Sequence, residues 1–211
     1  MERERTAQWA VLLAIMVSHL GLSLRRTASL VAPFGVFVSH VAIWYWLQKG
    51  GQRAPVSPED LPAVVVLDET WIKVGGREAW IFTAFDPQTW RVLSLEPFAR
   101  RTEKTVQTFL RHLAQRYGGY GAWPKEVITD GGRWYAACLG LLSYRKGFRW
   151  RIVKGGVRSA IEGFSGEFLK RRLKDFDCYC PSRAGLRSLR NWLWAYSWLH
   201  NEIKGGHYIV F

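Results

Sequence analysis

The pattern of hydrophobic and polar positions divides the chain into two parts that we expect to fold differently. Residues 1–50 carry helical patterns, whereas the stretch from residue 64 to residue 98 reads as three strands separated by turns. Residues 51–62, between the two parts, are rich in proline and glycine, which is typical of a linker. We therefore predict a small helical module over residues 1–50 and a larger domain over residues 63–211.

The N-terminal module contains two short helical patterns on either side of a helix break. Residues 24–31 form the first, Pro33-Phe34-Gly35 interrupts it, and Ser39 is a good N-cap for a second helix over residues 40–48. Two short helices joined by a glycine-containing turn favour a helix-turn-helix, whose second helix can lie in a major groove of DNA. The alternative is an ordinary helical hairpin, because the residues after Ser39 are poor in charge. If the module binds DNA, the candidate contacts are Arg25, Arg26, Ser39 and His40.

The most strand-like stretch of the chain is residues 64–73, where four apolar residues lead directly into Asp68. Burying an unpaired carboxylate costs several kcal/mol, so Asp68 should meet a cation, a metal ion or a network of hydrogen bonds. The alternative is that Asp68 lies near the end of the strand and caps a neighbouring helix or binds an arginine. Strand-like residues 78–85 and 90–98 follow, and the three strands should form an antiparallel meander.

The rest of the domain alternates between helices and strands. The expected elements are a helix opening at Thr102, a strand over 126–129, a helix over 134–142, a strand over 148–153, a basic helix over 158–174 and a tryptophan-rich helix over 186–203. This order predicts an α/β fold with a ribonuclease H-like mixed five-stranded sheet and flanking helices, preceded by the small all-α helix-turn-helix module. Strands one and four are neighbours in such a sheet, so Asp68 and Asp130 could face each other.

A third carboxylate can reach the same edge from a helix packed on the sheet. Glu162 lies on the apolar side of the helix predicted over 158–174. Converging carboxylates suit Mg²⁺ or Mn²⁺, and two such ions stabilise both the attacking and the leaving oxygen of a phosphodiester displacement. Each acid also has a structural alternative, since Asp130 could begin a tight turn and Glu162 could pair with Arg158. Glu69 should point to the opposite face of its strand, outside this site.

The net charge of the protein indicates which class of molecule it binds. The 211 residues contain 30 Lys and Arg against 17 Asp and Glu, a formal net charge of +13. A balance this basic indicates a polyanion, and nucleic acid fits better than a membrane surface. The apolar run over residues 9–17 is too short to span a bilayer, and the three cysteines fit neither a zinc site nor a disulfide framework. We expect a cytoplasmic protein without a membrane partner.

Three motifs carry a resemblance to a known family. L-D-E-T-W-I-K-V at 67–74, V-I-T-D-G at 127–131 and the A-I-E…L-K-R-R-L-K-D-F stretch at 160–176 resemble the DDE transposases of prokaryotic insertion sequences, and most of all the insertion-sequence-6 family. The resemblance implies cleavage at the ends of the element to free a 3′-OH, which then attacks target DNA. It implies a homodimer or larger assembly on double-stranded DNA, in association with the nucleoid. It also implies two Mg²⁺ (or Mn²⁺) ions held by a catalytic triad of Asp68, Asp130 and Glu162.

The sequence departs from the family pattern around the third acid. The gap between Asp130 and Glu162, residues 131 through 161, is slightly short, and the position seven residues after Glu162 is Leu169, where the family usually has a basic residue. Glu167 is therefore a rival third acid. The same helix would contact DNA phosphates through Lys170, Arg171, Arg172 and Lys174.

Two other functions remain open on the sequence. A ribonuclease H-like nuclease would hydrolyse DNA without rejoining it, and a truncated copy of the element could be a catalytically inactive DNA-binding protein. The presence of all three acids disfavours the inactive protein.

Overall fold

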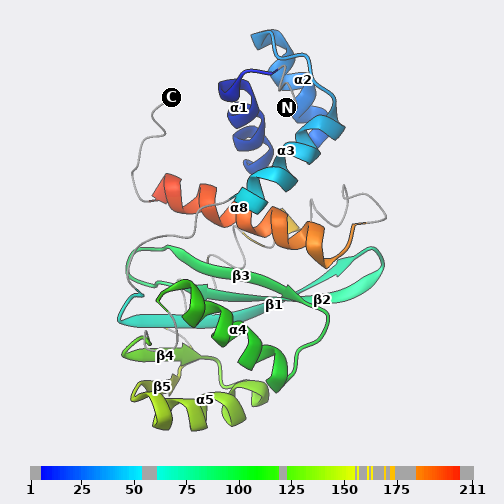
Figure 1. Cartoon of the computed structure of the whole chain (residues 1–211). Coiled ribbons are helices and arrows are strands. Elements are labelled where there is room, and N and C mark those ends of the chain that lie inside the picture. The colour runs from blue at the N-terminus through cyan, green and yellow to red at the C-terminus, as the bar shows by residue number, and fades with distance from the viewer. Residues whose placement is uncertain are drawn as a thin grey trace.

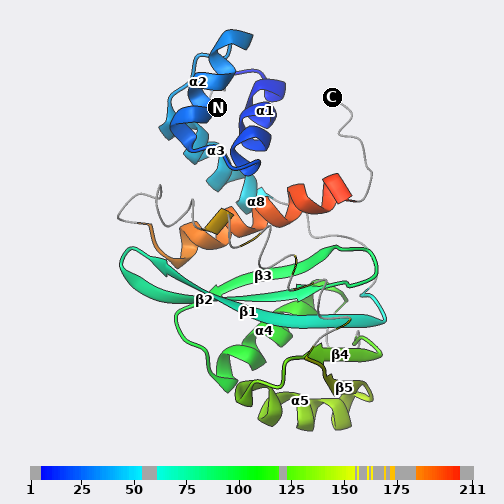
Figure 2. The same ribbon diagram turned by 180° about the vertical axis from the view of Figure 1, so that it is seen from behind.

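The computed structural model describes most of the chain and shows a helical part lying over one face of a sheet (Figure 1). A long helix lies between the two, and further helices cover the opposite face of the sheet (Figures 1 and 2). None of the helices described is long and apolar enough to cross a membrane. The described residues are 6–53, 61–118, 123–154 and 184–204, together with 156, 161, 163, 169, 172 and 173.

The sheet has five strands in the order β3-β2-β1-β4-β5. Its first three strands form an antiparallel meander, whereas β4 runs parallel to both β1 and β5. This is the predicted ribonuclease H-like arrangement, and the fold prediction is confirmed. The third strand begins at Val92, later than expected, because Trp90 has a left-handed backbone with φ of 61°. The bounds are β1 Val64–Val74, β2 Arg77–Phe85, β3 Val92–Phe98, β4 Glu126–Thr129 and β5 Arg149–Ile152.

Some of the helices begin at side-chain N-caps. Ser39 Oγ accepts a hydrogen bond from the Ala42 N–H at 3.1 Å, as predicted for an N-cap, and Thr102 forms a capping box with Thr105. The predicted basic helix over 158–174 lies largely outside the described residues. The bounds are α1 Gln8–His19, α2 Leu24–Val31, η1 Ala32–Phe34, α3 His40–Arg53, α4 Glu103–Arg116, α5 Arg133–Lys146 and α8 Leu186–Lys204.

The sheet separates two hydrophobic cores because side chains alternate between its faces. Val65 and Leu67 of β1 pack in the core formed with α4 and α5. Val66 and Ile72 point the other way, into the core shared with α8 and with α1, α2 and α3. The N-terminal helices therefore share one continuous core with the α8 face of the sheet.

The junction between α3 and α8 differs from the predicted linker. Residues 51–53 were expected in the linker, yet they continue α3, and Gly51 is buried against α8. A Cβ at Gly51 would lie 1.7 Å from the backbone oxygen of Asn191, so only glycine permits this contact. The Gln48 and Asn191 side chains are joined by a 3.1 Å hydrogen bond at the same junction. Tertiary packing thus overrides the low helix propensity of glycine.

His19 anchors the end of α1 on the same helix, α8. Its ring stacks on Trp192 and on Tyr196 with centroid distances of 5.7 Å, and its Nδ1–H donates to the Ile15 carbonyl at 3.0 Å. Burial lowers the pKa of His19 to about 4, and the positive charge of Arg172 acts in the same direction, while the hydrogen bond to Ile15 opposes the shift. His19 is therefore neutral in the folded protein at neutral pH.

The free energy of unfolding should fall as the pH drops from 6.5 to 4. The unfolded state takes up a proton at His19 near pH 6.5, whereas the folded state does so only near pH 4. His19 contributes on the order of 3 kcal/mol to the free energy of unfolding above pH 6.5, and this contribution is lost as the pH falls to 4. Urea denaturation of the wild type and of His19→Phe, which can stack but cannot titrate, measures it. An identical pH dependence in the two proteins would contradict the prediction.

Candidate active site

Asp68 and Asp130 lie at the same level on two neighbouring parallel strands. The register pairs Val66 of β1 with Ile128 of β4, and two positions further along each chain come Asp68 and Asp130. Backbones of neighbouring strands are about 4.8 Å apart, so the two carboxylates are close together. Both residues are partly exposed. The sheet therefore brings Asp68 and Asp130 together, as predicted.

Asp130 begins a tight turn between β4 and α5. Its Oδ1 accepts a hydrogen bond from the Gly132 N–H at 2.8 Å. Gly131 has φ of 84°, and a Cβ there would lie 2.7 Å from Cγ2 of Ile152, so this position needs glycine. The turn suggested as a structural alternative therefore exists. It is compatible with metal binding, because a carboxylate has about four lone-pair sites and this hydrogen bond takes one.

Glu69 points to the opposite face of β1, as predicted, where its side chain is only 4% exposed. The hydroxyl of Tyr135 donates to Glu69 Oε2 at 2.6 Å, and Nη1 of Arg101 lies 3.2 Å from Oε1. Burial raises the pKa of Glu69 and the negative charges of Asp130 and Asp68 raise it further, while Tyr135 and Arg101 lower it. Glu69 is thus close enough to Asp68 and Asp130 for their negative charges to raise its pKa.

The partners of Glu69 are themselves held firmly. The guanidinium of Arg101 lies between two indole rings, 3.8 Å from the centroid of Trp80 and 3.7 Å from that of Trp134. Tyr135 is fully buried. Burial, followed by the charge of Glu69, raises its pKa well above the usual value, so the hydroxyl stays protonated as a donor.

Sequence reasoning did not identify these partners. A glutamate in a buried strand does indicate that a cation must be near. That signal does not indicate which residue supplies the charge.

The third predicted acid lies outside the described residues. Its neighbour Ile161 and, further on, Leu169 are both completely buried in the core on the α8 face, the face toward which Asp68 points. Within the described residues, no three Asp, Glu, His or Cys side chains form a group that could hold a metal ion. The predicted site residues outside the described part of the chain are Glu162, its rival Glu167, Lys170, Arg171 and Lys174.

Arg172 packs against the N-terminal helices. A Cβ at Gly21, in the turn between α1 and α2, would lie 1.5 Å from Nη1 of Arg172. The space left by the missing side chain of Gly21 admits the guanidinium. Arg172 therefore lies against the turn between α1 and α2. Its predicted role as a phosphate contact stays a prediction.

The predicted DNA contacts of the helical part lie on its surface. Arg25 and Arg26 are exposed on α2, and Ser39 and His40 are exposed at the start of α3. The Ser39 hydroxyl oxygen is engaged in capping α3. Residues 6–53 contain no Asp or Glu, so this surface has no negative side chain of its own.

Comparison with known proteins places the two aspartates within a recognised domain. Residues 63–162 match a family model described as a DDE domain. The match begins one residue before β1 and ends at Glu162. No curated protein matches the chain at a significant level.

Solved structures of retroviral proteins resemble parts of the chain. The HTLV-2 integrase catalytic core domain in complex with magnesium, in its dimeric form, has 16% sequence identity and a TM-score of 0.44, with coverage of 64% of this chain and 87% of that one. The simian T-cell lymphotropic virus intasome in complex with the PP2A regulatory subunit B56 gamma has 16% identity and a TM-score of 0.49, with coverage of 85% and 66%.

Proposed function

Because residues 63–162 form the DDE domain of an insertion-sequence transposase, a DDE-type polynucleotidyl transferase, we propose that this protein binds the ends of an insertion sequence and catalyses metal-dependent cleavage and strand transfer of DNA. The observation that carries the proposal is the placement of Asp68 and Asp130 at the same level of neighbouring strands. Both residues lie inside the matched segment.

The residues present suit a hard divalent cation. Asp68 and Asp130 offer only oxygen ligands, and Mg²⁺ and Mn²⁺ prefer such ligands. The charges of both aspartates raise the pKa of the buried Glu69, so negative charge accumulates here, where a cation would neutralise it. The HTLV-2 integrase core holds magnesium. When bound, two such ions stabilise both the attacking and the leaving oxygen of the phosphodiester.

The protein supplies rigid placement of the metal ligands. Asp68 is held by β1, which is paired on both sides, and Asp130 is held by the hydrogen bond from Gly132. We assign Glu162 as the third ligand. The match ends at this residue, before Glu167, and the adjacent Ile161 is buried on the face toward which Asp68 points.

DNA would bind through the basic surface of the chain. The net charge is +13, and residues 6–53 combine exposed arginines with a complete lack of acidic residues. We assign end recognition to a helix-turn-helix formed by α2 and α3. The phosphate contacts of the predicted basic helix would add affinity without sequence selection.

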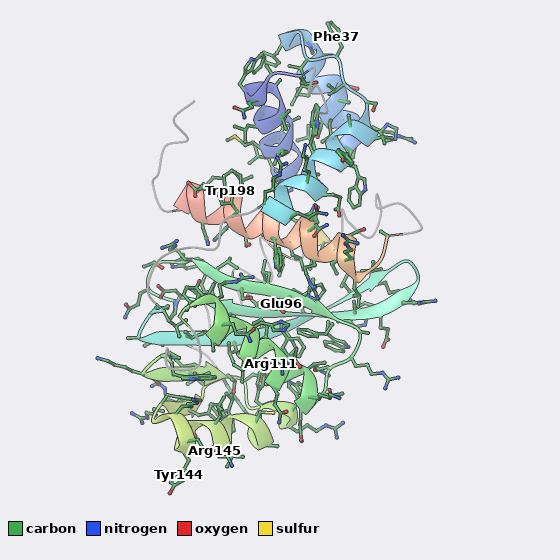
Figure 3. All side chains as sticks on the ribbon, viewed as in Figure 1. Phe37, Glu96, Arg111, Tyr144, Arg145 and Trp198 are labelled. Carbon is green, nitrogen blue, oxygen red and sulfur yellow. The ribbon has the colours of Figure 1, made fainter. Side chains whose placement is uncertain are left out.

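Replacing Arg25 and Arg26 together by alanine should weaken binding to the element's ends and flatten its salt dependence. Each lost phosphate contact lowers the slope of log K against log salt by about 1, so the double variant should lose about 2. Fluorescence anisotropy at several NaCl concentrations measures this. Arg111→Ala is the matched control, because Arg111 is exposed on α4, far from the helical part (Figure 3). An equal effect of both changes would contradict the assignment.

The decisive experiment is cleavage of labelled DNA that carries the repeats flanking the gene, with Mg²⁺, Mn²⁺ and EDTA compared. A transposase should yield joined DNA with either metal and nothing with EDTA. Free ends without joined DNA would support the ribonuclease H-like nuclease. Specific binding without cleavage under every condition would support an inactive DNA-binding protein.

Processing two ends requires at least two active sites, so we also propose a dimer or larger assembly on DNA. Light scattering of the complex with end DNA measures its mass. A DNA-acting transposase would work at the nucleoid.

A further inference from the structure

A group of three side chains, Glu69, Tyr135 and Arg101, connects the two chain segments that carry Asp68 and Asp130. Glu69 directly follows Asp68 in β1, and Tyr135 stands in the first turn of α5, three residues after Gly132, whose N–H holds Asp130. The 2.6 Å hydrogen bond from Tyr135 to Glu69 therefore joins β1 to the start of α5.

Arg101 fixes the other oxygen of the same carboxylate. It lies just after β3, and its guanidinium is stacked between Trp80 of β2 and Trp134 of α5. A cation in contact with two indole rings has little freedom to follow a displaced carboxylate. The group thus includes residues from β1, β2, α5 and the segment after β3. A shift of β1 relative to α5 would break at least one of these contacts.

We propose that Tyr135, Glu69 and Arg101 are positioning residues that hold Asp68 and Asp130 at the separation required for a divalent cation. The proposal rests on the proposed function, because it concerns the same site. Residues that orient metal ligands typically change metal affinity or activity by 10–100-fold when they are substituted. The contrasting possibility is that the group only stabilises the fold, in which case its loss would leave metal binding unchanged in the folded protein.

Tyr135→Phe tests the proposal by removing a single hydroxyl group. We expect Mn²⁺ affinity, measured by titration calorimetry on the purified full chain, to fall about tenfold. The Mg²⁺ concentration for half-maximal cleavage should rise by a similar factor. The matched control is Tyr117→Phe. Tyr117 is also buried and its hydroxyl donates to the Leu93 carbonyl at 3.3 Å, but it lies at the C-cap of α4 rather than beside the aspartates. This control should bind Mn²⁺ as the wild type does.

Arg101→Lys is a second test that does not depend on Tyr135→Phe folding. Lysine keeps the positive charge but loses the planar stacking on the two indoles, so Mn²⁺ affinity should again fall by several-fold. Wild-type Mn²⁺ affinity in folded Arg101→Lys, or an equal loss in Tyr135→Phe and Tyr117→Phe, would overturn the proposal. If the wild type binds Mn²⁺ but does not cut DNA, the proposed function fails while the Mn²⁺ affinities still test the positioning role.

Discussion

Replacing Asp68 by asparagine should abolish DNA cleavage while leaving binding to the element's ends largely intact. The change keeps the size of the side chain but removes the charge that a divalent cation requires. A metal ion contributes several kcal/mol to the transition state, and about 4 kcal/mol corresponds to a factor of about 1,000 in rate. We therefore expect a loss of at least about 1,000-fold, measured with labelled end DNA and Mg²⁺. Affinity for the same DNA is measured in parallel.

The matched control for this change is Asp86→Asn. Asp86 is buried, and its carboxylate accepts hydrogen bonds from the Gln88 N–H at 2.9 Å and the Thr89 hydroxyl at 2.6 Å. Asp86→Asn should therefore lower stability and leave the cleavage chemistry intact. Retained cleavage together with lost end binding in Asp68→Asn would contradict the assignment of Asp68 to the metal site.

Replacing Gly51 by alanine should strongly destabilise the protein. Alanine in place of glycine normally stabilises a helix by about 1 kcal/mol. At Gly51, however, the added Cβ would lie 1.7 Å from the backbone oxygen of Asn191, and backbone cannot rotate away as a side chain can. Forcing an extra methyl group into such a contact costs about 1–3 kcal/mol and occasionally more. We expect about 3 kcal/mol in urea denaturation, with weaker end binding as α3 separates from α8.

The neighbouring glycine provides the control. A Cβ at Gly50 would meet only Cδ1 of Ile15 at 3.9 Å, an ordinary contact distance. Gly50→Ala should therefore stabilise the protein or leave its free energy of unfolding unchanged. The same sign of change at both positions would show that Gly51 is not closely packed against α8.

Local pattern was sufficient for the sheet and for the two aspartates. Strands of alternating or continuous apolar residues, separated by glycine and proline turns, predicted five strands and their order, because few topologies fit such an element sequence. The pairing of Asp68 with Asp130 then followed from the adjacency of β1 and β4. The sequence pattern did not indicate that Trp90 adopts a left-handed conformation, so that β3 begins only at Val92.

Other features depend on residues that are distant in the chain, and only the folded structure brings them together. Glu69 meets Tyr135 and Arg101 because the sheet and α5 bring them to one point, and no local period encodes that contact. Gly51 looks like the start of a linker until α8 packs on it.

The two aspartates follow from the sequence pattern, whereas the group of Glu69, Tyr135 and Arg101 follows from tertiary contacts. Hydrophobic period and charge, which are properties of neighbouring residues, determine the strands, the basic character and the place of Asp68 at the end of an apolar run. Which side chains support Asp68 and Asp130 depends on contacts between elements. The free energy of those contacts comes from burial and close packing, so it exists only once the elements have assembled.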